Sequence, residues 1–187
     1  MNNICSSMII LEAILVVIES QKSEIQQALE RLPLKLKIEY ATIPTDSDFG
    51  TADALKHISD RIKTNIIALS CDVVTNVSLF GLLNVFRQHD AGLATLLLRG
   101  GAEGATTVPG PKMKHIPERD LIALHPETKR LLFLSSTSDF EEKMSLPGHL
   151  LRKRGKIAVH SRLVDSHIYI MKKWVVDFLS DVSIDII

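Results

Sequence analysis

The chain has 187 residues, and its 22 basic side chains balance its 22 acidic ones to give a formal net charge of zero. This length predicts one domain, or one domain with a small extension. With 45% hydrophobic and 24% charged residues, the composition is that of an ordinary soluble globular protein. The balanced charge argues against a nucleic-acid-binding surface, which needs a clustered excess of basic side chains.

The sequence favours a reducing, cytoplasmic environment over a membrane or secretory one. Cys5 and Cys71 are the two cysteines, and their spacing suits neither a disulfide framework nor a metal site. The apolar stretch at 8–18 contains Glu12 and is shorter than the roughly 20 residues that cross a bilayer. It also lacks the features of a signal peptide, so we expect it to form a buried central strand.

Strands and helices alternate in the first half of the chain. A buried strand is expected at 14–18, followed by a helix at 22–32 with Ser20 as its N-cap and Pro33 as its stop. The next expected elements are a half-exposed strand at 35–40, a helix at 51–62, a fully buried strand at 65–69, a helix at 77–89 and a strand at 92–98. Strands joined by helices of this length predict crossover units and a mostly parallel sheet.

The second half has shorter elements. Glycine and proline are frequent at 99–117, which predicts a mobile internal loop. Further on, the pattern predicts a hairpin of strands 120–124 and 130–134 turning at 125–128, strands at 157–161 and 167–171, and a helix at 172–179 whose Trp174, Val175 and Phe178 pack on the sheet. The expected fold is therefore α/β, with an open, mostly parallel sheet that carries helices on both faces, in one domain at 8–187.

A candidate binding site follows from the strand that ends at Asp72. Ligands of an open α/β sheet sit outside the carboxyl ends of its strands, which makes Asp72 a candidate metal ligand. Gly50, Thr51 and Ala52 open the preceding helix and are candidate cofactor-binding residues. The alternatives are that Asp72 has a structural role and that Gly50 and Thr51 only start a helix.

Three other features are compatible with either a chemical or a structural role. Asp165 and His167 share one face of a strand, which suits acid–base chemistry, although a hydrogen-bonded structural pair is the favoured interpretation. Cys71 has the negative neighbour Asp72, which disfavours a thiolate and so a catalytic thiol. The basic run at 152–154 is expected to be a solvated helix end rather than a phosphate-binding patch.

Several segments together resemble the gamma subunits of eukaryotic translation initiation factor 2B. They are PTDSDFGTADAL at 44–55, LSCD at 69–72, RLLF at 130–133, LVDSHIY at 163–169 and WVVDFL at 174–179. The resemblance covers roughly residues 13–187. More widely, the segments are similar to the sugar-phosphate nucleotidyltransferases, which implies a nucleotidyltransferase-like (Rossmann-like) fold.

The resemblance to nucleotidyltransferases implies that the site residues are vestigial. Gly50, Thr51 and Ala52 match a Gly-Thr-Ala motif of that superfamily, and Asp72 matches its metal aspartate. The family's glycine-rich phosphate loop and the lysine-proline pair after it have no counterpart in this sequence. We therefore expect a shortened form, incomplete at the amino-terminal edge of the sheet and without the carboxyl-terminal left-handed β-helix of the gamma subunits.

The function implied by the resemblance is that of a non-catalytic subunit of the guanine-nucleotide exchange factor for translation initiation factor 2. Its expected partners are the epsilon subunit, the other subunits of factor 2B and translation initiation factor 2 itself, with no cofactor, no direct nucleic acid and no membrane. A sheet without its first strand would have an uncovered strand edge, and such an edge together with exposed apolar residues favours association. The alternative is an enzyme, a sugar-phosphate nucleotidyltransferase that uses Mg²⁺ to position phosphates.

Overall fold

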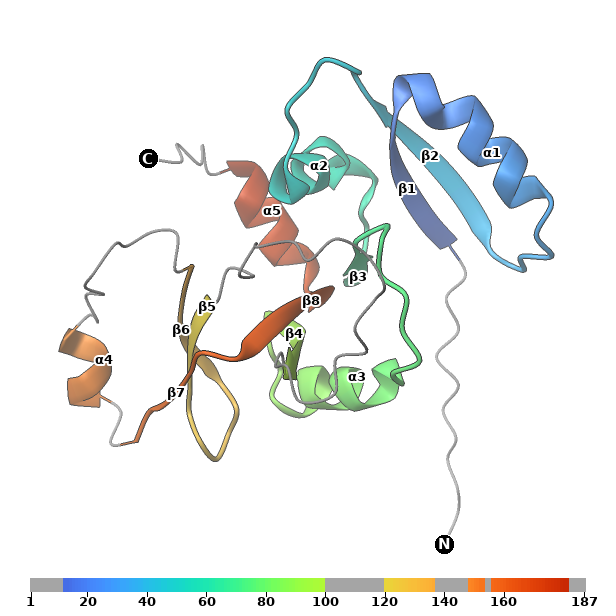
Figure 1. Cartoon of the computed structure of the whole chain (residues 1–187). Helices are drawn as coiled ribbons and strands as arrows, with labels where there is room; N and C mark the ends of the chain where they lie inside the picture. The colour runs from blue at the N-terminus through green and yellow to red at the C-terminus, as the bar shows by residue number, and fades with distance from the viewer. Residues whose placement is uncertain (1–11, 100–119, 137–147, 154–155, 182–187) are drawn as a thin grey trace, which may run out of the picture. The chain divides into compact units, whose positions relative to one another are not determined.

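A computed structural model describes residues 12–99, 120–136, 148–153 and 156–181 (Figure 1). Strands and helices alternate in the first half of the described chain, and the second half mixes a strand hairpin with helices, which confirms the predicted α/β class. The chain divides into two compact units. The first unit contains the described residues up to 68, residues 74–94 and those from 169 onward, and the second contains residues 69–73 and the described part of 95–168. The predicted loop at 99–117 lies outside the described residues, apart from Arg99.

The first unit begins with a parallel crossover. Strands β1 (Glu12–Ile18) and β2 (Lys37–Ile43) pair in parallel along their full length, joined through the 3-10 turn η1 (Glu19–Gln21) and helix α1 (Lys22–Glu30). The prediction of Ser20 as N-cap is wrong, because Ser20 lies inside η1 and Gln21 precedes α1 without a side-chain cap.

Strand β1 is neither central nor fully buried, so that prediction is also wrong. In the described part of the chain, β1 forms a two-stranded sheet with β2, and Val17 is the only buried residue of β1. Helix α1, which follows β1 in the chain, buries none of its residues. Strand β2 alternates exposed and half-buried residues before the buried Ala41, which confirms the prediction of a half-exposed strand.

A three-stranded sheet follows, with the order β3-β8-β4. Its strands are β3 (Ile66–Leu69), β4 (Leu93–Arg99) and the late strand β8 (Leu163–Met171), and the helical elements are α2 (Thr51–His57), η2 (Ser59–Arg61), α3 (Leu79–Gln88) and α5 (Lys173–Asp181). The expected fully buried strand at 65–69 is wrong in its burial, since Leu69 is 55% exposed and the rest of β3 is half-buried. The helix expected at 51–62 ends early and continues as η2.

The core of the first unit joins α2 to α5, which pack against each other. Its buried side chains are Ala41, Leu55, Ile58, Ile62, Met171 and Val176. A smaller cluster contains Phe86, Ala94 and Ile170. The prediction that Trp174, Val175 and Phe178 pack on the sheet is wrong for Phe178, which is 59% exposed. Val175 is partly buried beside Val176, on which the buried side of α5 centres. Trp174 is also 59% exposed, with only part of its ring against Gly92, just before β4.

The second unit contains an antiparallel sheet with the order β6-β5-β7. Strands β5 (Asp120–Leu124) and β6 (Leu131–Ser136) form the predicted hairpin, which the His125 N–H closes by donating to the Arg130 carbonyl at 2.9 Å. Strand β7 (Ala158–His160) pairs antiparallel with β5 on its other side. The short helix α4 (Gly148–Lys153) precedes β7 in the chain.

Candidate functional site

Gly50 stands at the N-cap of α2, with the exposed Thr51 and Ala52 after it. The Gly50 N–H donates to Asp53 Oδ2 at 3.0 Å, and the Gly50 carbonyl accepts from the Ala54 N–H at 3.0 Å. A Cβ at residue 50 would meet Asp53 Oδ2 at 3.4 Å, an ordinary contact, so the local packing does not require glycine. These contacts start a helix, and a cofactor-binding role for the three residues stays a prediction.

Asp72 lies just beyond β3 with its carboxylate exposed. The Ser70 hydroxyl donates to Asp72 Oδ1 at 2.6 Å, and this bond, ahead of a backbone hydrogen bond, holds the pKa of Asp72 below its ordinary range. The described residues contain no group of three or more His, Cys, Asp or Glu side chains that could hold a metal ion. A single carboxylate does not fit a magnesium site without phosphates beside it, so metal binding by Asp72 stays a prediction.

Asp165 acts as a backbone anchor at an irregular point of β8. His167 has a φ of 56°, which is rare for a residue other than glycine and interrupts the alternation expected along a strand. Asp165 Oδ1 accepts from the His167 N–H at 3.0 Å and from Thr95 Oγ1 at 3.2 Å, while the His167 carbonyl accepts from the Ser70 N–H at 3.2 Å. These contacts support the favoured interpretation of a structural pair, with the carboxylate bonded to the backbone of His167.

The other sequence candidates lie on exposed surface. Cys71 is exposed and its thiol is free of any disulfide. Arg152 is exposed in α4, whereas the Lys153 side chain and Arg154 lie outside the described residues. Among the described residues, neither Cys71 nor Arg152 has contacts that identify a ligand.

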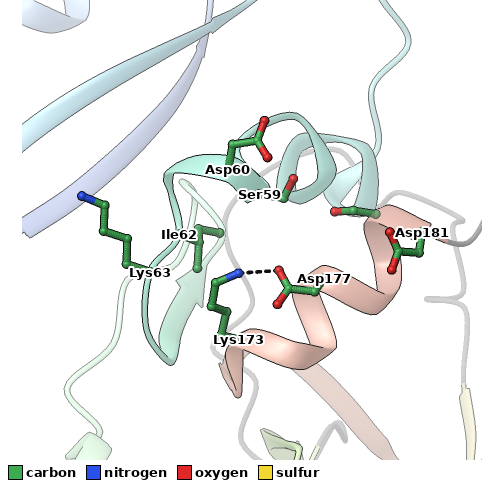
Figure 2. Close-up of a pocket in the computed structure, with 8 residues that line it drawn as sticks. Ser59, Asp60, Ile62, Lys63, Lys173, Asp177 and Asp181 are labelled. Atoms are coloured by element: carbon green, nitrogen blue, oxygen red, sulfur yellow. Dashed lines mark hydrogen bonds and ion pairs between the residues drawn. The ribbon is translucent and has the colours of Figure 1, made fainter.

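A groove between η2 and α5 is the feature that sequence reasoning missed. It has a volume of ≈ 580 Å³ and lies within the first unit, lined by Ser59, Asp60, Ile62, Lys63, Lys173, Asp177, Ser180 and Asp181 (Figure 2). Lys173 Nζ and Asp177 Oδ1 point toward each other and form an ion pair at 2.5 Å. The four-residue spacing of Lys173 and Asp177 is a sequence signal of an ion pair on a helix. The distant segment 59–63 carries no sequence signal that it lines the same groove.

Exposed apolar side chains accompany this groove on α5. Trp174 and Phe178 are each 59% exposed, which is high for large aromatic side chains. Among the described residues, no helix is long and apolar enough to cross a membrane. Exposed apolar groups that gather on one face mark interaction sites, so we take this face of α5, together with the groove, as the candidate functional surface.

Three known proteins that are similar to this chain are subunits of a translation initiation factor. No protein-family model matches the chain. Translation initiation factor eIF2B subunit gamma of Caenorhabditis elegans is 30% identical over 156 residues, which cover 82% of this chain and 36% of that relative. The Schizosaccharomyces pombe subunit is 29% identical over 149 residues, covering 79% and 31%, and the Dictyostelium discoideum subunit is 23% identical over 174 residues, covering 89% and 39%.

The chain is similar to eIF2B gamma subunits along 79–89% of its length. This confirms the resemblance found in the sequence. The chain spans about a third of the length of these relatives, between 31% and 39%. The similarity to eIF2B gamma subunits fits the mixed α/β architecture and a nucleotidyltransferase-like fold, in which the parallel sheet of this chain is small.

Proposed function

We propose that this chain acts in translation initiation as part of an eIF2B-type complex, where it supports exchange of GDP for GTP on translation initiation factor 2. The similarity to three gamma subunits across 79–89% of the chain carries the proposal. Each of these relatives is named as a subunit of translation initiation factor eIF2B. The chain acts through subunit contacts in the cytosol, where a free thiol such as Cys71 stays reduced.

The proposed role is structural and not enzymatic. Magnesium-dependent phosphoryl chemistry relies on one or two carboxylates together with groups that position phosphates. In the described chain, Asp72 is engaged by the Ser70 hydroxyl, and Gly50 opens α2 with its N–H turned to Asp53. These contacts support a scaffold in which the former site residues stabilise local turns.

The proposed partners are an epsilon-type subunit and the other subunits of the complex. Large apolar side chains on the surface of the first unit support association, led by Trp174 and Phe178 on α5. Tryptophan is over-represented among the residues that contribute most of the binding energy at protein interfaces. The described surface therefore has the side chains that a subunit contact uses.

Co-expression tests the proposal. The chain and a tagged epsilon subunit from the same organism are produced together, purified on the tag and separated by size exclusion. We expect the chain to co-elute with the epsilon subunit and to give a higher soluble yield than alone. The release of labelled GDP from translation initiation factor 2 should be faster with the pair than with the epsilon subunit alone. A well-behaved monomer that ignores this partner contradicts the proposal.

A further inference from the structure

One side of α5 presents two aromatic rings to solvent. Trp174 and Phe178 are four residues apart, so they lie one turn apart on the same side of the helix. The buried side of the helix faces elsewhere, because Val176 is fully buried and Val175 and Leu179 pack partly against the same core. Trp174 is also the only tryptophan in the chain. The rings therefore form a solvent-facing aromatic surface with a built-in spectroscopic reporter.

Carboxylates border this aromatic surface. Asp177 is three residues from Trp174, and Asp181 is three residues from Phe178, so each carboxylate is a neighbour of a ring on the helix surface. Lys173 neutralises Asp177 through their ion pair at 2.5 Å. Asp181 is exposed, and among the described residues no cation pairs with it.

The charge of Asp181 opposes the helix to which it belongs. Asp181 is the last described residue of α5, and no basic residue stands in the last turn. The carboxyl end of a helix carries a partial negative charge, which is unfavourable for an anion and favourable for a cation. Asp177 and Asp181 also line the groove, where the facing segment adds Asp60 and Lys63. Carboxylates outnumber ammonium groups in this lining, and one of the two ammonium groups is already paired.

We propose that Trp174, Phe178 and Asp181 form a docking surface for a segment of a partner subunit that presents an arginine flanked by apolar side chains. A guanidinium is a planar cation that stacks on an aromatic ring and donates to a carboxylate at the same time. Phe178 and Asp181, three residues apart on the helix surface, offer both contacts, and Trp174, one turn before Phe178, covers the neighbouring apolar side chain. The inference rests on the proposed function, since the partner is the epsilon-type subunit.

Fluorine NMR of Trp174 tests the docking surface directly. The full chain is labelled with 5-fluorotryptophan, and the unlabelled epsilon subunit from the same organism is the probe. We expect the single resonance to shift and broaden on addition of the partner and to become shielded from a soluble paramagnetic agent. Phe178→Ala and Asp181→Arg should each weaken binding at least about tenfold, and the loss for Asp181→Arg should shrink at high salt.

Matched variants elsewhere in the first unit are the controls. Phe80 is 40% exposed on α3, and Asp48 is exposed before α2. Phe80→Ala and Asp48→Arg should leave the affinity within about twofold of the original. Circular dichroism of all four variants verifies that they are folded.

Three results overturn the inference. Binding with an unchanged fluorine resonance and unchanged affinity in Phe178→Ala and Asp181→Arg contradicts the docking surface and leaves the proposed function standing. A resonance that shifts with chain concentration alone shows that a second copy of the chain covers the surface. Absence of any binding to the epsilon subunit contradicts both the inference and the proposed function.

Discussion

Trp174 lies directly against Gly92, since a Cβ atom at residue 92 would stand 2.7 Å from Trp174 Cζ2. The same atom would meet Val175 Cγ2 at 3.5 Å. The Gly92 carbonyl also accepts from the Lys172 N–H at 2.8 Å, just before the first turn of α5. The missing side chain at residue 92 therefore lets the start of α5 and its tryptophan approach the chain that leads into β4.

Gly92→Ala should destabilise the first unit. The new methyl group forces the Trp174 ring or the α5 backbone to move, and overpacking of this kind costs about 1–3 kcal/mol of unfolding free energy. Urea unfolding followed by the fluorescence of Trp174 measures the loss. The matched control is Gly81→Ala in α3, where a Cβ would meet nothing within 4 Å. This control should be neutral or stabilising by up to about 1 kcal/mol, and equal stability of the two variants contradicts the expected clash.

The orientation of α5 is a feature that the local sequence pattern does not predict. Apolar residues occupy most sides of this helix, with Trp174, Val175, Val176, Phe178 and Leu179 in close succession. Helical periodicity predicts the helix but does not select its buried side, which here depends on packing against residues of α2 and β2. The hairpin of β5 and β6 was predicted well because its turn and pairing are local in the sequence.

The candidate site also has parts that local sequence patterns predicted and a part that they did not. The positions of Gly50 before α2 and Asp72 after β3 follow from short local patterns, and the structure has them there. The groove joins residues 59–63 to residues 173–181, and β8 lies between β3 and β4 although it follows them by many residues. Long-range pairing of this kind leaves no signal in a single sequence, because it depends on the packing of apolar faces that are far apart in the chain.

Ser70→Ala should raise the pKa of Asp72 toward its ordinary range. The Ser70 hydroxyl stabilises the ionised carboxylate and is the largest cause of the lowered pKa. A lowered pKa in the folded state stabilises the fold above the unfolded value near about pH 4, and this contribution disappears as the pH falls through the folded pKa. A carbon-13 NMR titration of the Asp72 carboxyl group measures the change.

The control for this titration is Ser47→Ala. The Ser47 hydroxyl donates to the Pro44 carbonyl at 2.6 Å and not to a carboxylate. We expect this variant to leave the Asp72 titration unchanged. An Asp72 pKa that is identical in the original chain and in Ser70→Ala shows that the hydroxyl does not stabilise the carboxylate in solution.

His167→Gly should be tolerated in spite of its position in β8. At a φ of 56°, a residue with a Cβ pays a steric penalty of about 1 kcal/mol that glycine avoids. The bonds to Asp165 and Ser70 use the backbone of residue 167, so they survive the substitution. We expect the free energy of unfolding, followed by circular dichroism, to stay equal or to rise by up to about 1 kcal/mol. The matched change His160→Gly in β7 should instead lose about 0.5–1 kcal/mol, and a larger loss at residue 167 than at residue 160 contradicts this account.

A nucleotide-binding assay distinguishes a structural role of this chain from an enzymatic one. Isothermal titration of the chain with GTP, ATP or UTP in the presence of Mg²⁺ should show no micromolar binding, because Asp72 belongs to no group of three or more His, Cys, Asp or Glu side chains among the described residues. Asp72→Ala should give the same heats as the original chain, and an authentic sugar-phosphate nucleotidyltransferase under the same conditions verifies the assay. Micromolar binding that disappears in Asp72→Ala would assign the chain a working nucleotide site and favour nucleotidyl transfer over a purely structural role.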